Sequence, residues 1–265
     1  MAFSAMPGST SQIIHHESFF RIAMFELYSR AGQVLRNNFW LFAAFSAIEV
    51  FVNNMGAISP GLGGKFVLYA FVTLFSHRLI LSGASTSLGE SFRADPNGPL
   101  AGPMLPFLLR FTGLMLIGAV IWAICGFCLW SIFEPSENDV FFIVMVSSLL
   151  PAALLFYGVL SLIGPVLPAA AAGQDASFGK AFQIGRQGFG RNYLRLISGN
   201  FLFTIINIAF TLGLVVLLPA TQIAPFVYAT DWLLGLVGVF ALLLTATALC
   251  MAYEEGQPSA PDAPA

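Results

Sequence analysis

Long apolar runs alternate with short polar segments along most of this chain. A helix of about 20 apolar residues crosses the roughly 30 Å hydrocarbon core of a bilayer. The pattern therefore predicts an all-α fold, a polytopic membrane helix bundle with six transmembrane helices. The predicted spans cover residues 39–57, 65–82, 104–133, 140–170, 196–218 and 232–253.

Two further segments are amphipathic rather than uniformly apolar. Residues 17–37 place apolar side chains at helical spacing, with polar residues between them. Residues 175–194 are basic and follow an apolar run that Pro165 and Pro168 interrupt. Because basic amphipathic helices lie in the membrane interface, we predict an interfacial helix in each segment. We also expect a kink at Pro151, inside the fourth span.

The two ends of the chain are polar. Residues 1–14 and residues 254–265 are rich in Pro, Gly, Ser or Ala, and both predict disordered tails. The membrane domain is therefore expected to cover residues 15–253.

The composition excludes a soluble globular domain. Hydrophobic residues make up 57% of the chain and charged residues only 9%, whereas a soluble domain carries about 25% charged residues. The net charge of −2 gives no sign of nucleic-acid binding. The three cysteines lie inside apolar runs, which does not suggest a secreted disulfide framework.

Basic residues are distributed unevenly between the two sides of the predicted bundle. Lys65 lies on one side, and the other ten Lys and Arg residues lie on the opposite side, among them the four of the basic segment. Positively charged loops stay in the cytoplasm, so both ends of the chain are expected to be cytoplasmic. The four residues of the basic segment are candidate contacts for anionic lipid headgroups: Lys180, Arg186, Arg191 and Arg195.

The two amphipathic segments resemble each other. Residues 25–42 align with residues 179–196 without gaps, and each copy ends in Asn followed by an aromatic residue, at Asn38 and Asn192. An internal duplication and an independent origin of two similar helices both account for this likeness.

Short stretches also resemble a group of bacterial six-span inner-membrane proteins. Leu167–Ala170 closes the fourth span, Ser177–Phe182 opens the basic segment, and that segment runs on to Arg191-Asn192-Tyr193. His77–Leu81 resembles a short HR-x-x-L element of this group. The group includes the membrane domain attached to some glycerophosphoryl diester phosphodiesterases. The resemblance implies a bacterial inner-membrane protein of unassigned role; the phosphodiesterase activity belongs to a separate soluble barrel that no stretch here could form.

Glu49 is the most conspicuous single residue, because it lies near the middle of the first span. An ionisable side chain at this depth costs about 2.5–3.5 kcal/mol on insertion scales. Arg78 and Arg110 lie within reach by depth, so we expect a polar cluster of Glu49, Arg78 and Arg110, with His77 beside it. A salt bridge that holds the bundle together is one interpretation. An ion pathway, a proton pathway or a headgroup site is the other.

Other motifs have simpler interpretations. Cys125-x-x-Cys128 matches a redox motif, but it lies inside a span, and packing thiols are expected. The glycines of the basic segment suggest close packing on neighbouring spans. Asn200 and Asn207 lie on one helix face and suggest hydrogen bonds between helices.

No catalytic, metal-binding or cofactor-binding set is predicted. We therefore expect a non-enzymatic, structural or accessory membrane protein that contacts anionic phospholipids. A small transporter or channel that uses Glu49 with Arg78 or Arg110 is the first alternative. A membrane-embedded lipid enzyme is the second.

Overall fold

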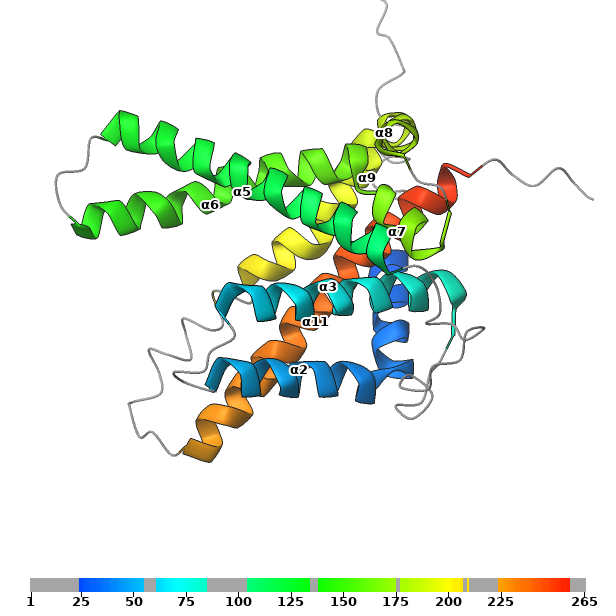
Figure 1. The fold of residues 1–265 in the computed structure, drawn as a ribbon, viewed down its shortest axis with the longest axis horizontal. Helices are drawn as coiled ribbons and strands as arrows, with labels where there is room; N and C mark the ends of the chain where they lie inside the picture. The colour runs from blue at the N-terminus through cyan, green and yellow to red at the C-terminus, as the bar shows by residue number, and fades with distance from the viewer. Residues whose placement is uncertain are drawn as a thin grey trace, which may run out of the picture.

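The computed structural model describes residues 24–54, 61–84, 104–133, 138–174, 177–206, 209 and 224–257. Every regular element within these residues is helical, which confirms the all-α class (Figure 1). Residues 24–37 and 202–206 are helical. The remaining elements are α2 (Phe39–Asn54), α3 (Gly61–Ser82), α5 (Leu105–Phe133), α6 (Asn138–Ile163), α7 (Val166–Ala171), α8 (Phe178–Gln187), α9 (Phe189–Leu196), the π-helical η2 (Ile197–Phe201) and α11 (Ala224–Glu255).

Three of these helices are long and apolar enough to cross a membrane. The candidate spans are Gly64–Ser82 in α3, Leu105–Ile132 in α5 and Tyr228–Glu255 in α11. Two shorter apolar helical stretches are Phe39–Val52 and Ser147–Ile163. These lengths indicate a multi-pass membrane protein with three candidate spans among the described residues.

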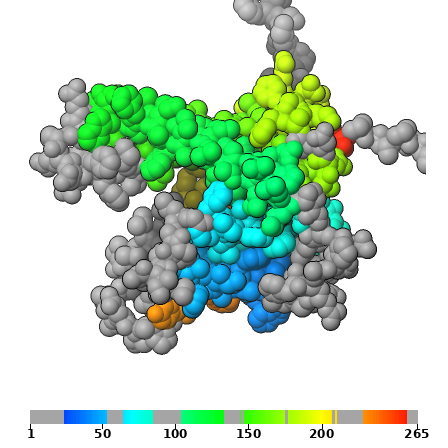
Figure 2. Space-filling view, in the orientation of Figure 1, coloured from blue at the N-terminus to red at the C-terminus, as the bar shows by residue number. Residues whose placement is uncertain are grey.

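The core forms where α11 crosses the antiparallel pair of α2 and α3 (Figure 1). Leu243 and Leu244 on α11 are fully buried there. Polar contacts also join α11 to α2, because the Ser46 hydroxyl donates to the Trp232 carbonyl at 2.7 Å and the Trp232 indole donates to the Ala43 carbonyl at 3.2 Å. In contrast, α5 and α6 pair with each other, and the end of α5 and the start of α6 project from the rest of the molecule (Figure 1 and Figure 2).

The fourth predicted span, residues 140–170, is not one helix. It is divided into α6, which ends at Ile163, and the short buried helix α7, which begins at Val166. Pro165 has no backbone N–H to continue the hydrogen-bond ladder. The chain is also crowded there, because a Cβ at Gly164 would overlap the Leu160 carbonyl and the Leu249 side chain. Helix α6 itself runs through Pro151.

The predicted interfacial helix 175–194 is also divided. Helices α8 and α9 meet at Gly188, which leaves the α-helical conformation with φ −107° and ψ 15°. Helix α9 then continues into η2. The basic segment is therefore bent, and its second half leads directly into the next apolar stretch.

The end of the last span also differs from the prediction. Helix α11 covers Ala224–Glu255 instead of residues 232–253, and it includes Glu254 and Glu255, for which the sequence predicts a disordered tail. Ion pairs described below hold both glutamates. The tail 1–14, most of the fifth span beyond residue 206 and residues 258–265 lie outside the described residues.

Candidate functional site

Basic side chains gather at one end of the bundle, which we call the basic end. Residues 24–37, the last turn of α3, α7, α8, α9 and the last turn of α11 meet there (Figure 1). Arg30 donates to the Ile80 carbonyl at 3.3 Å, and Arg78 donates to the Ala171 carbonyl at 3.3 Å. Lys65, at the first turns of α3, lies at the opposite end.

Ion pairs tie the last turn of α11 to both amphipathic segments. Arg30 binds Glu254 through two hydrogen bonds of 2.6 and 2.5 Å. Arg195 binds Glu255 through two of 3.0 and 2.8 Å, and Arg191 approaches the same carboxylate to 2.5 Å. We call these five residues the C-terminal clamp. The hydrogen bonds with Glu254 raise the pKa of the Arg30 guanidinium above its ordinary value.

The clamp divides the four predicted lipid contacts into two groups. The Arg195 side chain is only 6% exposed and the Arg191 side chain is 38% exposed, and both bind Glu255. Lys180 and Arg186 on α8 are exposed. Arg191 and Arg195 therefore serve the internal structure, and Lys180 and Arg186 face the surroundings.

Helix α8 is amphipathic and sits close to α6. Ser177 caps its first turn by accepting a hydrogen bond from the Lys180 backbone at 3.2 Å. A Cβ at Gly185 would overlap the Leu162 carbonyl oxygen on α6, so this glycine permits a backbone-to-backbone contact. Gly179 and Gly190, for which we predicted the same role, meet no neighbouring span within 4 Å.

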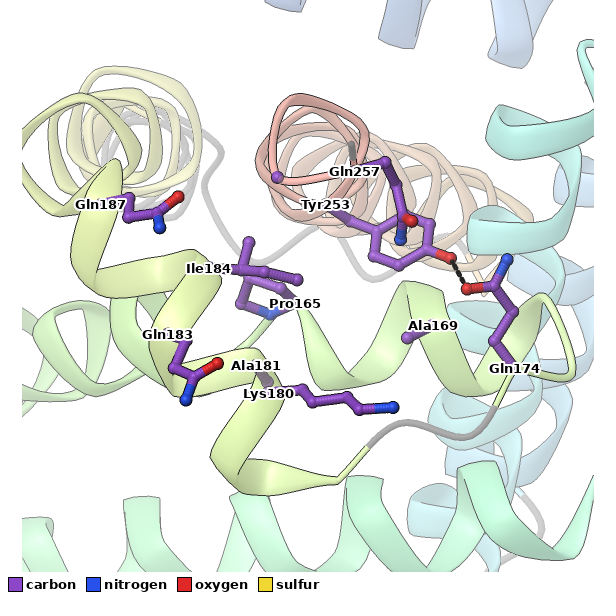
Figure 3. Close-up of a pocket in the computed structure, with 11 residues that line it drawn as sticks. Pro165, Ala169, Gln174, Lys180, Ala181, Gln183, Ile184, Gln187, Tyr253 and Gln257 are labelled. Carbon is purple, nitrogen blue, oxygen red and sulfur yellow. Dashed lines mark hydrogen bonds between the residues drawn. The ribbon is translucent and has the colours of Figure 1, made fainter. Parts of the chain in front are cut away.

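A cavity of about 450 Å³, the interfacial pocket, lies between α7, α8 and the last turn of α11 (Figure 3). Its apolar lining consists of Pro165, Ala169, Ala181 and Ile184. Its polar lining consists of Gln174, Lys180, Gln183, Gln187, Tyr253 and Gln257. The Tyr253 hydroxyl donates to Gln174 Oε1 at 2.6 Å, which connects the end of α11 to the residues that follow α7 (Figure 3).

The predicted intramembrane cluster does not assemble around Glu49. The Glu49 carboxylate accepts a hydrogen bond from the Tyr69 hydroxyl instead. Helices α2 and α3 are antiparallel, so Glu49 near the end of α2 faces Tyr69 near the start of α3. Arg78 is nine residues further along α3, about 14 Å away along the axis. The Arg110 guanidinium donates to the Pro106 carbonyl of its own helix at 3.1 Å.

His77 lies in the core between α3, α5 and α11. It is fully buried, its ring packs edge-on against Phe107 at 5.8 Å between centroids, and its carbonyl lies 4.0 Å from Cys250 Sγ. Neither ring nitrogen has a hydrogen-bond partner among the described residues. This environment is that of a packed aromatic ring, which agrees with a structural role.

The remaining sequence candidates have ordinary environments. Asn200 donates to the Thr245 hydroxyl on α11 at 2.6 Å, which confirms the predicted bond between helices, and Asn207 lies outside the described residues. Cys125 and Cys128 are free thiols, and Cys128 is exposed on α5 rather than packed. Within the described part of the chain, no group of three His, Cys, Asp or Glu side chains could hold a metal ion.

The structure also supports the likeness of the two amphipathic segments. Asn38 and Asn192 are each 2% exposed. Each backbone N–H donates to the carbonyl four residues earlier, at 3.1 Å to Val34 and at 2.9 Å to Gly188. The two asparagines are thus equally buried, but Asn38 lies at the turn before α2 whereas Asn192 lies inside α9, after the break at Gly188.

Sequence reasoning missed the two acids of the clamp and the glutamines of the pocket. An acidic pair directly after an apolar span, on the side that carries the basic helices, is a signal that could have identified Glu254 and Glu255. The glutamines have no such signal.

No family model matches the chain, and no curated protein and no solved structure matches it either.

Proposed function

We propose that this chain is a six-span bacterial inner-membrane protein with a non-enzymatic, structural or accessory role. In this proposal α2, α3, α5, α6, the segment that begins at η2, and α11 all cross the bilayer. Its kinship with the six-span group described above rests on the stretches around Leu167–Ala170 and Ser177–Phe182. Both ends of the chain lie in the cytoplasm.

One observation carries the proposal, namely the gathering of both amphipathic segments and the end of α11 at the basic end. Exposed cations at this end include Arg36, Lys180 and Arg186. A basic residue near an anionic bilayer surface contributes about 1 kcal/mol of attraction. The basic end therefore fits the cytoplasmic headgroup layer, where anionic phospholipids would surround α8 and residues 24–37.

Reporter fusions test the topology. A reporter that is active only in the periplasm should be inactive after Gln257 and active after Phe133, because Phe133 follows the third span and Gln257 follows the sixth. Activity after Gln257 would overturn the proposed topology.

Lipid enrichment tests the contacts. Protein released from nanodiscs of mixed phosphatidylglycerol and phosphatidylcholine should retain phosphatidylglycerol preferentially, as measured by native mass spectrometry. Replacing Arg36, Lys180 and Arg186 together by Gln should remove this preference, and Lys65→Gln at the opposite end should leave it unchanged. Equal retention of both lipids by the unaltered protein would refute the proposed contacts.

A further inference from the structure

We propose that the interfacial pocket is a specific site for the phosphate of an anionic phospholipid headgroup, with Lys180 as the cation that binds it. This inference rests on the proposed function, since it needs the basic end to lie in the headgroup layer. It adds a defined, saturable site to the general attraction between basic residues and anionic lipid.

The balance of donors and acceptors in the pocket favours an anion. Lys180 brings three N–H donors, and each glutamine amide nitrogen brings two. The Tyr253 hydroxyl already engages Gln174 Oε1, which leaves the Gln174 amide nitrogen as a donor. Among the described residues that line the pocket, none is acidic. A ligand rich in acceptor oxygens and carrying negative charge satisfies these donors, and phosphate has both properties.

The nearby acids are already neutralised. Glu254 and Glu255 directly follow Tyr253, and their charge would repel an anion. Each of them is held in the C-terminal clamp, Glu254 by Arg30 and Glu255 by Arg191 and Arg195. The clamp therefore leaves the Lys180 charge available to the ligand.

The position and lining of the pocket favour a lipid over a soluble anion. One wall is apolar, through Ala169 and Ile184. Phe178 and Phe182, on the same helix as Lys180, are 43% and 44% exposed, as expected for aromatic side chains that enter the boundary between headgroups and acyl chains. The volume of about 450 Å³ lies within the range of roughly 300–1,000 Å³ that is typical of ligand pockets.

The wall formed by α11 is fixed from two directions. The clamp holds the last helical turn, and Gly256 lies so close to α8 that a Cβ there would overlap the Ile184 side chain. The shape of the pocket at the junction of α8 and α11 is therefore fixed by the clamp and by the contact between Gly256 and Ile184.

The test compares two exposed cations of the same helix. Lys180 lines the pocket and Arg186 does not, so Lys180→Met and Arg186→Met are matched variants. The full chain in neutral detergent is titrated with phosphatidylglycerol, with phosphatidylcholine or with inorganic phosphate. Thermal unfolding and native mass spectrometry report the first bound molecule.

Lys180→Met should weaken phosphatidylglycerol binding about tenfold, the loss of one charge-assisted contact, and Arg186→Met should change it by less than about twofold. Lys180→Arg should restore most of the affinity, and Gln257→Met should weaken binding without altering the charge.

Four outcomes separate this inference from its premise. Selective loss with Lys180→Met supports the pocket. Equal loss with both Met variants indicates diffuse attraction, which overturns the pocket and leaves the proposed function intact. Equal binding of phosphatidylglycerol and phosphatidylcholine by the unaltered protein overturns both. The pocket could instead bind inorganic phosphate, with Lys180→Met weakening that binding and with no preference for phosphatidylglycerol over phosphatidylcholine. This outcome would show that the pocket takes a free phosphate and would overturn the proposed lipid headgroup.

Discussion

Helices α5 and α11 are similar in sequence character and different in environment. Each provides a candidate span of 28 residues, yet the share of buried residues in an 18-residue apolar window is 6% for α5 and 44% for α11. On α5 the Thr112 and Ser131 hydroxyls donate to carbonyls of their own helix. On α11 the Trp232 indole donates a hydrogen bond to α2, and the Thr245 hydroxyl accepts one from Asn200 in η2. Hydropathy therefore identifies a span, and polar contacts between helices identify its neighbours.

The largest expected effect comes from truncating one leucine on each helix. Leu243 on α11 is fully buried and Leu116 on α5 is 62% exposed. Lipid is as apolar as leucine, so the loss on truncation comes mainly from packing inside the protein. Leu243→Ala should lower the free energy of unfolding by about 2 kcal/mol and Leu116→Ala by less than about 0.5 kcal/mol. Unfolding by sodium dodecyl sulfate in mixed micelles, followed by circular dichroism, measures both. Equal losses would show that α5 is as tightly packed as α11.

The C-terminal clamp provides the second test of how α11 is anchored. Removing the Glu255 charge with Glu255→Gln leaves Arg195 buried without its carboxylate, and we expect a loss of about 1–3 kcal/mol, between the values for exposed and buried pairs. Glu254→Gln is the matched variant. Its pair with Arg30 is more exposed, with side chains 29% and 40% accessible, so the expected loss is about 0–1 kcal/mol. The same unfolding assay compares the two variants, and a larger loss with Glu254→Gln would reverse our ranking of the pairs.

The smallest expected effect concerns a single hydrogen bond. Asn200→Ala and Thr245→Val, combined in a double-mutant cycle, should show a coupling of about 0.6 kcal/mol, the average for hydrogen bonds between membrane helices. Thr112→Val on α5 is the control, since its hydroxyl bonds its own helix and should not couple to Asn200. Coupling of similar size to both threonines would mean that the measured effect is not specific to this contact.

The positions of the long helices could be predicted because length and hydropathy alone determine them. Helix α5 covers the segment expected at 104–133, and α3 covers 65–82. Their partners could not be predicted from depth in the membrane. Glu49 and Arg78 are expected within reach of each other by depth, but antiparallel packing aligns Glu49 with Tyr69 instead. A pairing depends on the rotation and direction of both helices, which hydropathy does not encode.

The basic end was predicted in outline and missed in detail. The pattern of 175–194 predicted one amphipathic helix where the structure has α8 and α9, and its charges did not reveal that Arg191 and Arg195 bind an acid at the far end of the chain. The acidic pair after the last span signals that ion pairs form there, but nothing in its local sequence identifies which basic residues are the partners. The sequence shows Gly164 and Pro165, which directly follow the end of α6. Because the apolar residues of α7 continue the hydrophobic run beyond them, hydropathy alone predicts one long span instead of two helices.

The pair of Arg30 and Glu254 also bears on how the protein is made. The two residues are 224 positions apart, so Arg30 is synthesised long before its partner. At about 5–20 residues per second, the interval is roughly 10–45 s. During that time the first amphipathic helix can contact only lipid, water and the segments already synthesised, among them η2, where Tyr28 donates to the Ser198 carbonyl. The clamp is therefore among the last contacts to close, and its closure marks the arrival of the end of α11 beside residues 24–37 and α9.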